Sequence, residues 1–546
     1  MRMSGFTRAL AVLASAATLG APAALAQTPP PGEVTGGAIQ GLDLWSAAGR
    51  ETGLDSDLWR GTSAELAETV LGPLADQRLS VAEAALARRI LATAGRSPEG
   101  APPTLAALRS LTLIGLGDLE AAAEIGRRTP RLEVQPAIAR TAAESALWLG
   151  DDARACALGD TVQDRADLFW LRLRAYCELV SGNERAAQVS FGLWRESGDE
   201  ADGFARLLSQ ALLGEGEGPA DASDGLGWAL SRRLELDLPA PAASRRPVIA
   251  ARGADGEDLA AVSRALRLGL VDVGTVRAAY LARALPPGPS APAEALSPDA
   301  LADPAPTPLP EVPEGVVGEA NLYRVAHETR DADLRRRALV ALLGEAESAE
   351  AFVALSRLAA PELVALAREV PAGADPALLA QAAAVAGEPE AARALFSRAV
   401  RTEGGWDATR FALMEAIVAA SDARQGGSTL DRLVERGAAG SAPAQGAALI
   451  LSALGARMTP EARAQFATFD VPRPRTTPAR LTALALAGQD GHAGETALLA
   501  LSIVRQQPDG ITLADRAAIV SALRQAGLEE DARAIAMEGL LALARP

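Results

Sequence analysis

The side chains with the clearest chemical potential are Cys156 and Cys177, the only two cysteines in a chain of 546 residues. In an oxidising compartment an even number of cysteines favours a disulfide. A bridge over a loop of this size would add about 3 kcal/mol of stability by the loop-entropy model. The helices that carry them must be staggered for the bridge to close, because Cys177 lies further from the connecting turn. The alternative is a pair of buried free thiols.

The basic and imidazole side chains offer little for catalysis. All 53 basic residues are arginine, so the chain has no lysine for a Schiff base, a phosphate-binding loop or a serine–lysine pair. His327 and His492 are the only histidines, and neither stands near a nucleophile motif or in a metal-binding spacing. We therefore expect no catalytic residue, no metal, no cofactor and no enzymatic activity.

One carboxylate invites comparison with enzymes that cut peptidoglycan. Exported lytic transglycosylases combine a helical superhelix with a catalytic acid in a Glu-Ser motif, which a Gly-Leu-Met-Gln-like segment follows. Here Glu144-Ser145 runs on within an expected helix, and no such segment follows. We do not predict that Glu144 is catalytic. An envelope enzyme that uses paired carboxylates is kept as an alternative function.

Tryptophans are concentrated in the first half of the chain. Trp148, Trp170 and Trp194 are spaced 22 and 24 residues apart across the expected repeats. Core packing between helices explains such a spacing, and a stacking surface for sugars or peptides is the alternative. Trp45 and Trp59 precede the repeats and are expected to cap the open end of the helical stack.

The composition indicates an all-α protein. Aromatic residues make up only 3%, alanine and leucine dominate, and β-branched residues never gather into alternating runs. The net charge of -16 argues against a nucleic-acid partner and against anionic membrane surfaces. No later run is long enough without charges to span a membrane, so we do not expect an integral membrane protein.

The first residues resemble a secretory signal. Arg2 and Arg8 give a positive start, an apolar run follows, and small residues up to Ala26 form a cleavage site. We predict a signal peptide over 1–26 and a periplasmic location. The Pro- and Gly-rich residues 27–40 are expected to be disordered.

A short motif recurs at Gly117, Gly150 and Gly182, at steps of 33 and 32 residues. Each copy ends an apolar helical run, turns at glycine, and begins a helix with a small alanine five residues on. This pattern is typical of stacked helix-turn-helix repeats. The motif returns in the second half, where we assign the turns to Gly387, Gly488 and Gly527.

The chain divides at a proline-rich stretch. Residues 285–314 contain ten prolines among thirty residues, which is typical of a linker or a surface insertion. We expect helical-repeat domains over 41–284 and 315–546, and hence an α-solenoid of stacked repeats.

Two resemblances follow from these motifs. The Gly117 copy and its later copies resemble tetratricopeptide-type repeats, although the usual tryptophan, tyrosine and closing proline are mostly missing. Residues 57–63, with Arg174 to Cys177 before Gly182, look like exported helical-repeat proteins of alphaproteobacteria. That second resemblance implies a cell-envelope location and pairing of the two cysteines.

These observations predict a non-catalytic periplasmic scaffold. It would bind a protein or peptide partner in the cell envelope along its helices. The alternatives are the peptidoglycan-acting enzyme and a structural spacer without a binding groove. A deep pocket with two buried acids would favour the enzyme.

Overall fold

The computed structural model describes residues 43–544, except 164–166, 198–202, 215–217, 283–308, 310–312, 370–374, 403–407, 423–426 and 508. The expected signal peptide over 1–26 and the segment 27–40 therefore lie outside the described residues. By its contacts the chain divides into Met1–Leu42 and a compact unit, Asp43–Pro546, which is the part considered below.

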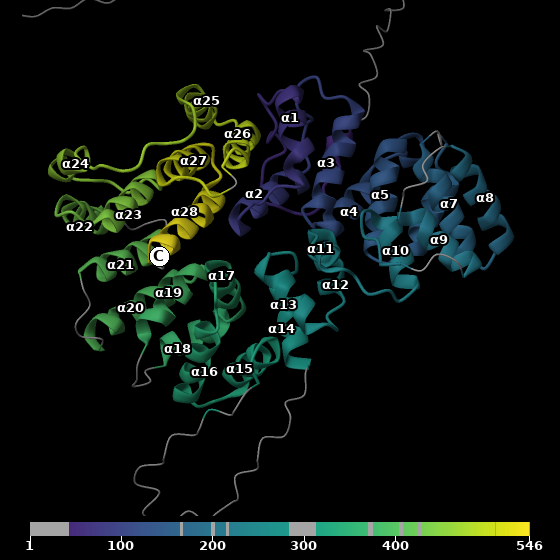
Figure 1. Cartoon of the computed structure of the whole chain (residues 1–546). Helices are drawn as coiled ribbons and strands as arrows, with labels where there is room; N and C mark the ends of the chain where they lie inside the picture. The colour runs from purple at the N-terminus through teal and green to yellow at the C-terminus, as the bar shows by residue number, and fades with distance from the viewer. Residues whose placement is uncertain are drawn as a thin grey trace, which may run out of the picture. The chain divides into compact units, whose positions relative to one another are not determined.

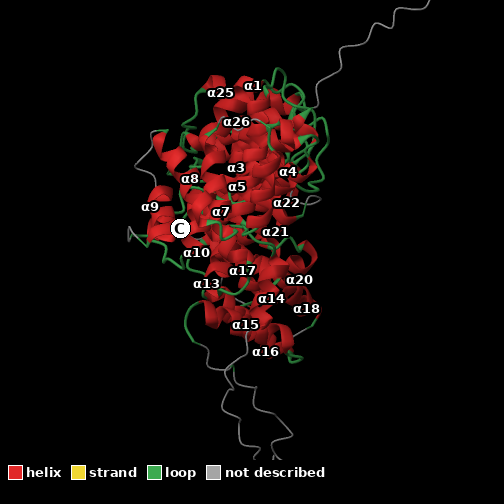
Figure 2. Cartoon of the chain, turned by 90° about the vertical axis from the view of Figure 1, so that its right-hand side faces the viewer, coloured by secondary structure: helices red, strands yellow, loops and turns green. Residues whose placement is uncertain are grey.

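The described residues form helices and no strand, which confirms the all-α class (Figure 2). Helices of the first part are η1 Leu44–Ser46, α1 Ala64–Leu74, α2 Val81–Ala92, α3 Pro103–Gly115, α4 Leu119–Arg128, η2 Leu132–Val134, α5 Pro136–Trp148, α6 Asp152–Thr161, α7 Leu168–Val180, α8 Glu184–Glu196, α9 Gly203–Leu213, α10 Gly225–Arg233, α11 Ala240–Ala243, α12 Arg246–Ala254, α13 Leu259–Arg267 and α14 Val273–Ala282.

The second part continues with α15 Val316–Glu328, α16 Ala332–Gly344, α17 Ala349–Leu358, α18 Ala360–Arg368, α19 Pro376–Val385, α20 Pro389–Thr402, α21 Ala408–Ser421, α22 Gly427–Ala438, α23 Ala442–Ala453, α24 Pro460–Phe466, α25 Pro478–Gln489, α26 Ala493–Arg505, α27 Leu513–Gln525 and α28 Glu529–Ala544. None of the helices in the described ranges is long and apolar enough to cross a membrane.

The recurring glycine forms the same turn each time. At the end of α3, Gly117 N–H donates to the Ile114 carbonyl and Asp118 N–H to the Leu113 carbonyl, both at 2.9 Å. These two bonds make a Schellman turn, which needs a left-handed residue, and Gly117 has a φ of +79°. The sequence motif is therefore a helix stop, and it connects α3 to α4, α5 to α6 and α7 to α8.

In the second half one turn glycine was assigned wrongly. The turn between α25 and α26 is at Gly491, with a φ of +71°, and not at Gly488. Gly488 lies within α25, where a Cβ would come within 2.8 Å of the Ala522 carbonyl of α27. A glycine is needed at this position because α25 and α27 pack closely, and not because the chain turns there. Gly387 and Gly527 do adopt the left-handed conformation, as expected.

Paired helices follow one another along the chain (Figure 1). The contacts join α1 to α3 and α3 to α5, and in the second half α17 to α19, α19 to α21 and α21 to α23. The last helix departs from this order, because α28 contacts α2, α17, α21 and α23 as well as its partner α27. The two ends of the unit are therefore packed together.

One hydrophobic core extends over both sides of the proline-rich stretch. It includes Leu44 near the start of the unit and Leu541 near its end, while a second cluster occupies α5 to α10. Across the stretch, the Tyr280 hydroxyl donates to the Glu319 carboxylate at 3.2 Å. Most of 285–314 lies outside the described residues, and its role as linker or insertion stays a prediction.

The contact between the chain ends replaces the expected cap. Gly494 N–H, in α26, donates to the Leu58 carbonyl at 2.9 Å. The Trp59 ring lies so close that a Cβ on Gly494 would meet it at 2.9 Å, and Trp45 packs edge-on against Trp59. Both tryptophans are buried. They join the first part of the unit to α26 instead of capping an open end.

Arginine side chains cap the carboxyl ends of helices across the fold. Arg277 of α14 donates to the last two carbonyls of α17, and Arg398 of α20 to the Leu366 and Ala367 carbonyls at the end of α18. A cation is favourable there because the helix dipole is negative at its carboxyl end. The guanidinium group suits this role since it offers five donors in a fixed fork.

Arg109 of α3 is the most buried of these arginines, with no exposed surface. It donates to the Leu91 and Thr93 carbonyls at the end of α2 and to the Trp45 and Ala47 carbonyls of the first segment. Burial lowers its pKa to about 9. One side chain therefore donates to four carbonyls, of which that of Trp45 also accepts from Gly95 N–H at 3.1 Å.

We predict that Arg109→Met lowers the free energy of unfolding by about 3 kcal/mol or more, because it removes the side-chain donor from buried carbonyls, of which that of Trp45 alone keeps a bond from Gly95 N–H. Urea unfolding followed by circular dichroism measures the change. Arg185→Met, at an exposed position of α8, is the matched control and should change it by less than about 0.5 kcal/mol. A loss at Arg109 as small as the control's would contradict the assigned role.

Candidate functional site

The tryptophans proposed as a stacking surface are core residues. Trp148, Trp170 and Trp194 are each at most 4% exposed. Trp148 stacks on Trp228, whose indole N–H donates to the Trp148 carbonyl at 3.2 Å, and Trp170 packs edge-on against Phe169. They fill the space between helices and present no face on which a ligand could stack.

The two cysteines come together as a disulfide. Cys156 of α6 and Cys177 of α7 have their sulfur atoms 1.99 Å apart and their Cα atoms 5.6 Å apart. The bridge joins the second helix of one pair to the first helix of the next, where α6 and α7 also pack directly. It fixes the step between two successive helix pairs.

We predict that Cys177→Ser lowers the stability of the region around α5 to α10 by about 3 kcal/mol, since the bridge closes a short loop of the unfolded chain. Thermal unfolding of the variant should match that of the reduced wild type. Maleimide labelling of the denatured, unreduced wild type provides the direct check. Two labelled thiols in that sample would overturn the pairing.

The histidines take part in local contacts. His327 Nδ1 lies 2.8 Å from the Glu362 carboxylate and stacks on Tyr323. His492 Nδ1 lies 3.3 Å from Glu495, next to the turn at Gly491. Across the described part of the chain, no three potential metal ligands gather in one place.

Glu144 holds two helices together. Its carboxylate accepts a hydrogen bond of 2.5 Å from Gly225 N–H, in the first turn of α10. Asp224 caps the same helix and pairs with Arg172 at 3.0 Å. Burial, and then the charge of Asp224, raises the pKa of Glu144 to about 7, against the opposing charges of Arg140 and Arg172. The chain thus has neighbouring carboxylates, in a contact that anchors α10 on α5.

This raised pKa gives a pH dependence with a definite sign. The folded state keeps the Glu144 proton to a higher pH than the unfolded chain, whose glutamate titrates near 4.5. The stabilising contribution is therefore complete below about pH 4.5 and is lost as the pH rises to about 7. Glu144→Gln keeps an acceptor for Gly225 N–H but removes the titration.

We predict that between pH 5 and 7.5 the free energy of unfolding of the wild type falls more steeply with pH than that of Glu144→Gln. The difference between the two slopes is up to about 1.4 kcal/mol per pH unit. Urea titrations at several pH values measure the two slopes. Glu68→Gln, an exposed change in α1, should keep the wild-type slope. Equal slopes for wild type and Glu144→Gln would show that this carboxyl does not titrate in that range.

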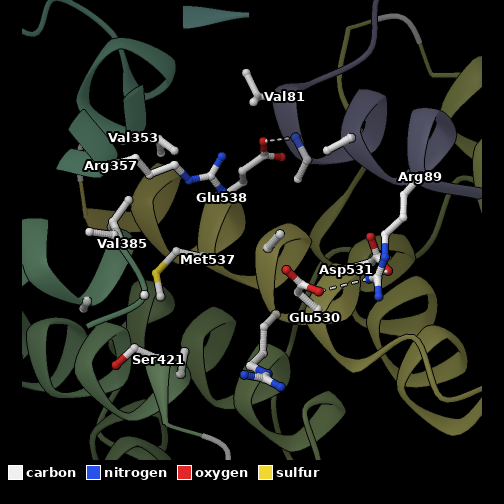
Figure 3. Close-up of a pocket in the computed structure, with 18 residues that line it drawn as sticks. Val81, Arg89, Val353, Arg357, Val385, Ser421, Glu530, Asp531, Met537 and Glu538 are labelled. Carbon is white, nitrogen blue, oxygen red and sulfur yellow. Dashed lines mark hydrogen bonds and ion pairs between the residues drawn. The ribbon is translucent and has the colours of Figure 1, made fainter. Parts of the chain in front are cut away.

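A cavity of about 410 Å³ opens where the two ends of the unit meet. It lies between α2, α17, the turn from α19 to α20, the end of α21 and α28 (Figure 3). Its apolar lining includes Val81, Val353, Val385 and Met537. Its charged lining is Arg89, Arg357, Glu530, Asp531, Arg533 and Glu538.

Most charges on the α2 and α28 side are engaged. Arg89 lies 2.7 Å from Asp531 and 3.2 Å from Glu530. Glu538 accepts a 2.8 Å hydrogen bond from Ala82 N–H, so a carboxylate of the last helix caps the amino end of α2. Burial raises the pKa of Glu538. These contacts set one wall of the cavity.

Arg357 stands on the opposite wall, at the end of α17. Its side chain extends toward Glu538 (Figure 3) and is exposed to solvent. Among the described residues, no carboxylate lies within ion-pair distance of its guanidinium group. The cavity walls remove enough water to lower its pKa, an effect that the charges of Glu538 and Glu530 partly offset.

The sequence analysis missed this cavity. Its walls come from segments as far apart as Val81 and Glu538, and no local pattern marks their meeting. The only local signal is the Ser80 capping box, whose Glu83 bonds Ser80 N–H and which fixes the start of α2. Comparison with protein-family models, curated proteins and solved structures found no match. The function is therefore argued from the cavity and the fold.

Proposed function

We propose that the chain is an exported, non-catalytic helical-repeat scaffold that binds a protein or peptide segment in the cell envelope. Residues 1–26 would be its signal peptide, cleaved after Ala26. The repeats would be TPR-like and stacked as an α-solenoid, whose last helix, α28, packs against α2. The disulfide between Cys156 and Cys177 is in keeping with an oxidising compartment.

The observation that carries the proposal is the cavity at the junction of the chain ends. A volume of about 410 Å³ is within the range of ordinary ligand sites, and it has room for a few side chains of a partner. Its lining combines apolar contacts with a few charged groups, as binding sites do. Five separate segments build it, so it depends on the whole fold.

The alternative of a peptidoglycan-acting enzyme would need two carboxylates facing a substrate. Burial raises the pKa of Glu144, which lies near Asp224, and also the pKa of Asp531 and Glu538 in the cavity. Asp531 pairs with Arg89, and Glu538 accepts from Ala82 N–H at the start of α2. However, Glu144 bonds Gly225 N–H and Asp224 bonds Gly227 N–H, and both bonds hold α10 in place. These engagements support a structural role. The spacer alternative differs in predicting no partner at the cavity.

We predict that a photo-crosslinking residue at Ser421, which lines the cavity, forms a defined adduct with an envelope protein in living cells. Ala534→Trp fills the cavity and should abolish the adduct, because the side chains of the partner no longer have space to enter. The same crosslinker at Ser181, exposed at the end of α7, is the matched control. Thermal melts show whether Ala534→Trp keeps the fold. An adduct that persists in a folded Ala534→Trp protein, or forms equally from 181, would overturn the proposal.

A further inference from the structure

Some charged side chains around the cavity have ion-pair partners and others do not. We infer that the bound segment carries an acidic side chain whose carboxylate binds Arg357. This inference rests on the proposed function, because it names the chemistry of the segment that the cavity takes. The partner class is a peptide segment with one Asp or Glu among small apolar residues.

The acids of the cavity are largely occupied. Asp531 and Glu530 lie beside Arg89, at 2.7 and 3.2 Å. One oxygen of Glu538 accepts from Ala82 N–H. The other is buried, lies 3.8 Å from the Arg516 guanidinium and has no hydrogen-bond donor among the described residues. A ligand cation would have to compete with these contacts. The arginines facing the cavity are less engaged.

Two cations are available to a ligand. Arg357 has no carboxylate within ion-pair distance among the residues that the structure describes. Arg533 has a loose contact of 3.8 Å with Glu529, whose side chain is 63% exposed. Both arginines line the cavity, one from α17 and one from α28. In a peptide segment the side-chain group that pairs with such cations is a carboxylate, which accepts charge-assisted hydrogen bonds from a guanidinium group.

Arg357 is also held in position before any ligand arrives. Arg277 donates to the Arg357 carbonyl at 3.2 Å and to the Leu358 carbonyl at 3.0 Å, which fixes the end of α17. A fixed backbone reduces the entropy that binding removes. Val353 and Val385 lie beside it and provide apolar contact for the neighbours of an acidic residue.

The carboxylate is that of a side chain and not of a chain end. Proteins commonly hold a terminal carboxylate with backbone N–H groups. Ala82 N–H at the start of α2, a backbone donor of a residue that lines this cavity, is already bonded to Glu538. The net charge of -16 also disfavours a strongly acidic partner over long range. An internal segment with a single acidic residue among apolar ones offers no terminal carboxylate and carries little net negative charge.

The test selects phage-displayed random heptapeptides, flanked by linkers so that they have no free chain end, on the full chain without its signal. Clones whose binding to the wild type is lost with Ala534→Trp define cavity ligands. We expect these clones to be enriched in Asp or Glu. Changing that residue to Gln or Asn, or Arg357 to Gln, should weaken binding about tenfold or more.

Controls separate a lost charge from a lost fold. Arg357→Lys should retain part of the affinity, and Arg185→Gln, on the exposed face of α8, should retain all of it. Cavity-dependent clones without acidic enrichment, or with affinity unchanged by Arg357→Gln, overturn this inference and leave the proposed function standing. Synthetic peptides that bind only through a free carboxyl end also overturn it. No cavity-dependent clone at all counts against both proposals.

Discussion

The contact of α28 with α2 is the interaction on which the rest of the unit depends. Glu538 caps the amino end of α2, where the helix dipole favours a negative charge. Asp531 pairs with Arg89 about two turns further along. The two helices are separated by more than four hundred residues, so bringing them together has a high loop-closure cost, which the shared hydrophobic core offsets. The cavity exists because this contact is made.

A stack of repeats in which each pair contacts only its neighbours gains stability step by step. This unit has that order along α1, α3 and α5 and again from α17 to α23, but α28 connects the two runs. Such long-range contacts make distant repeats depend on one another. The disulfide and the Glu144 contact lie in the separate cluster of α5 to α10, away from this junction.

Arginine is the polar residue that organises the interior. In a chain without lysine, guanidinium groups donate to carbonyls at helix ends, which have no N–H partner within their own helix. Arg109 does this with no exposed surface, and Arg88 bonds the Leu116 and Gly269 carbonyls. Several donors on one planar group allow one side chain to join helices that are far apart in sequence. Arg357 differs because its guanidinium faces the cavity.

The sequence by itself determined the local structure: helices throughout, Schellman turns at Gly117, Gly150 and Gly182, and a pair of cysteines near enough to bridge. These follow from backbone preferences and short separations, which act within a few residues. Only the tertiary structure decided that Trp148 is core, that Gly488 serves packing and that Val81 meets Glu538. The spacing of tryptophans along a helix is the same whether that helix face is buried or exposed. The segments that bury the face come from remote parts of the chain. The candidate site therefore could not be predicted, although the capping box that begins α2 and the turn at Gly387 could.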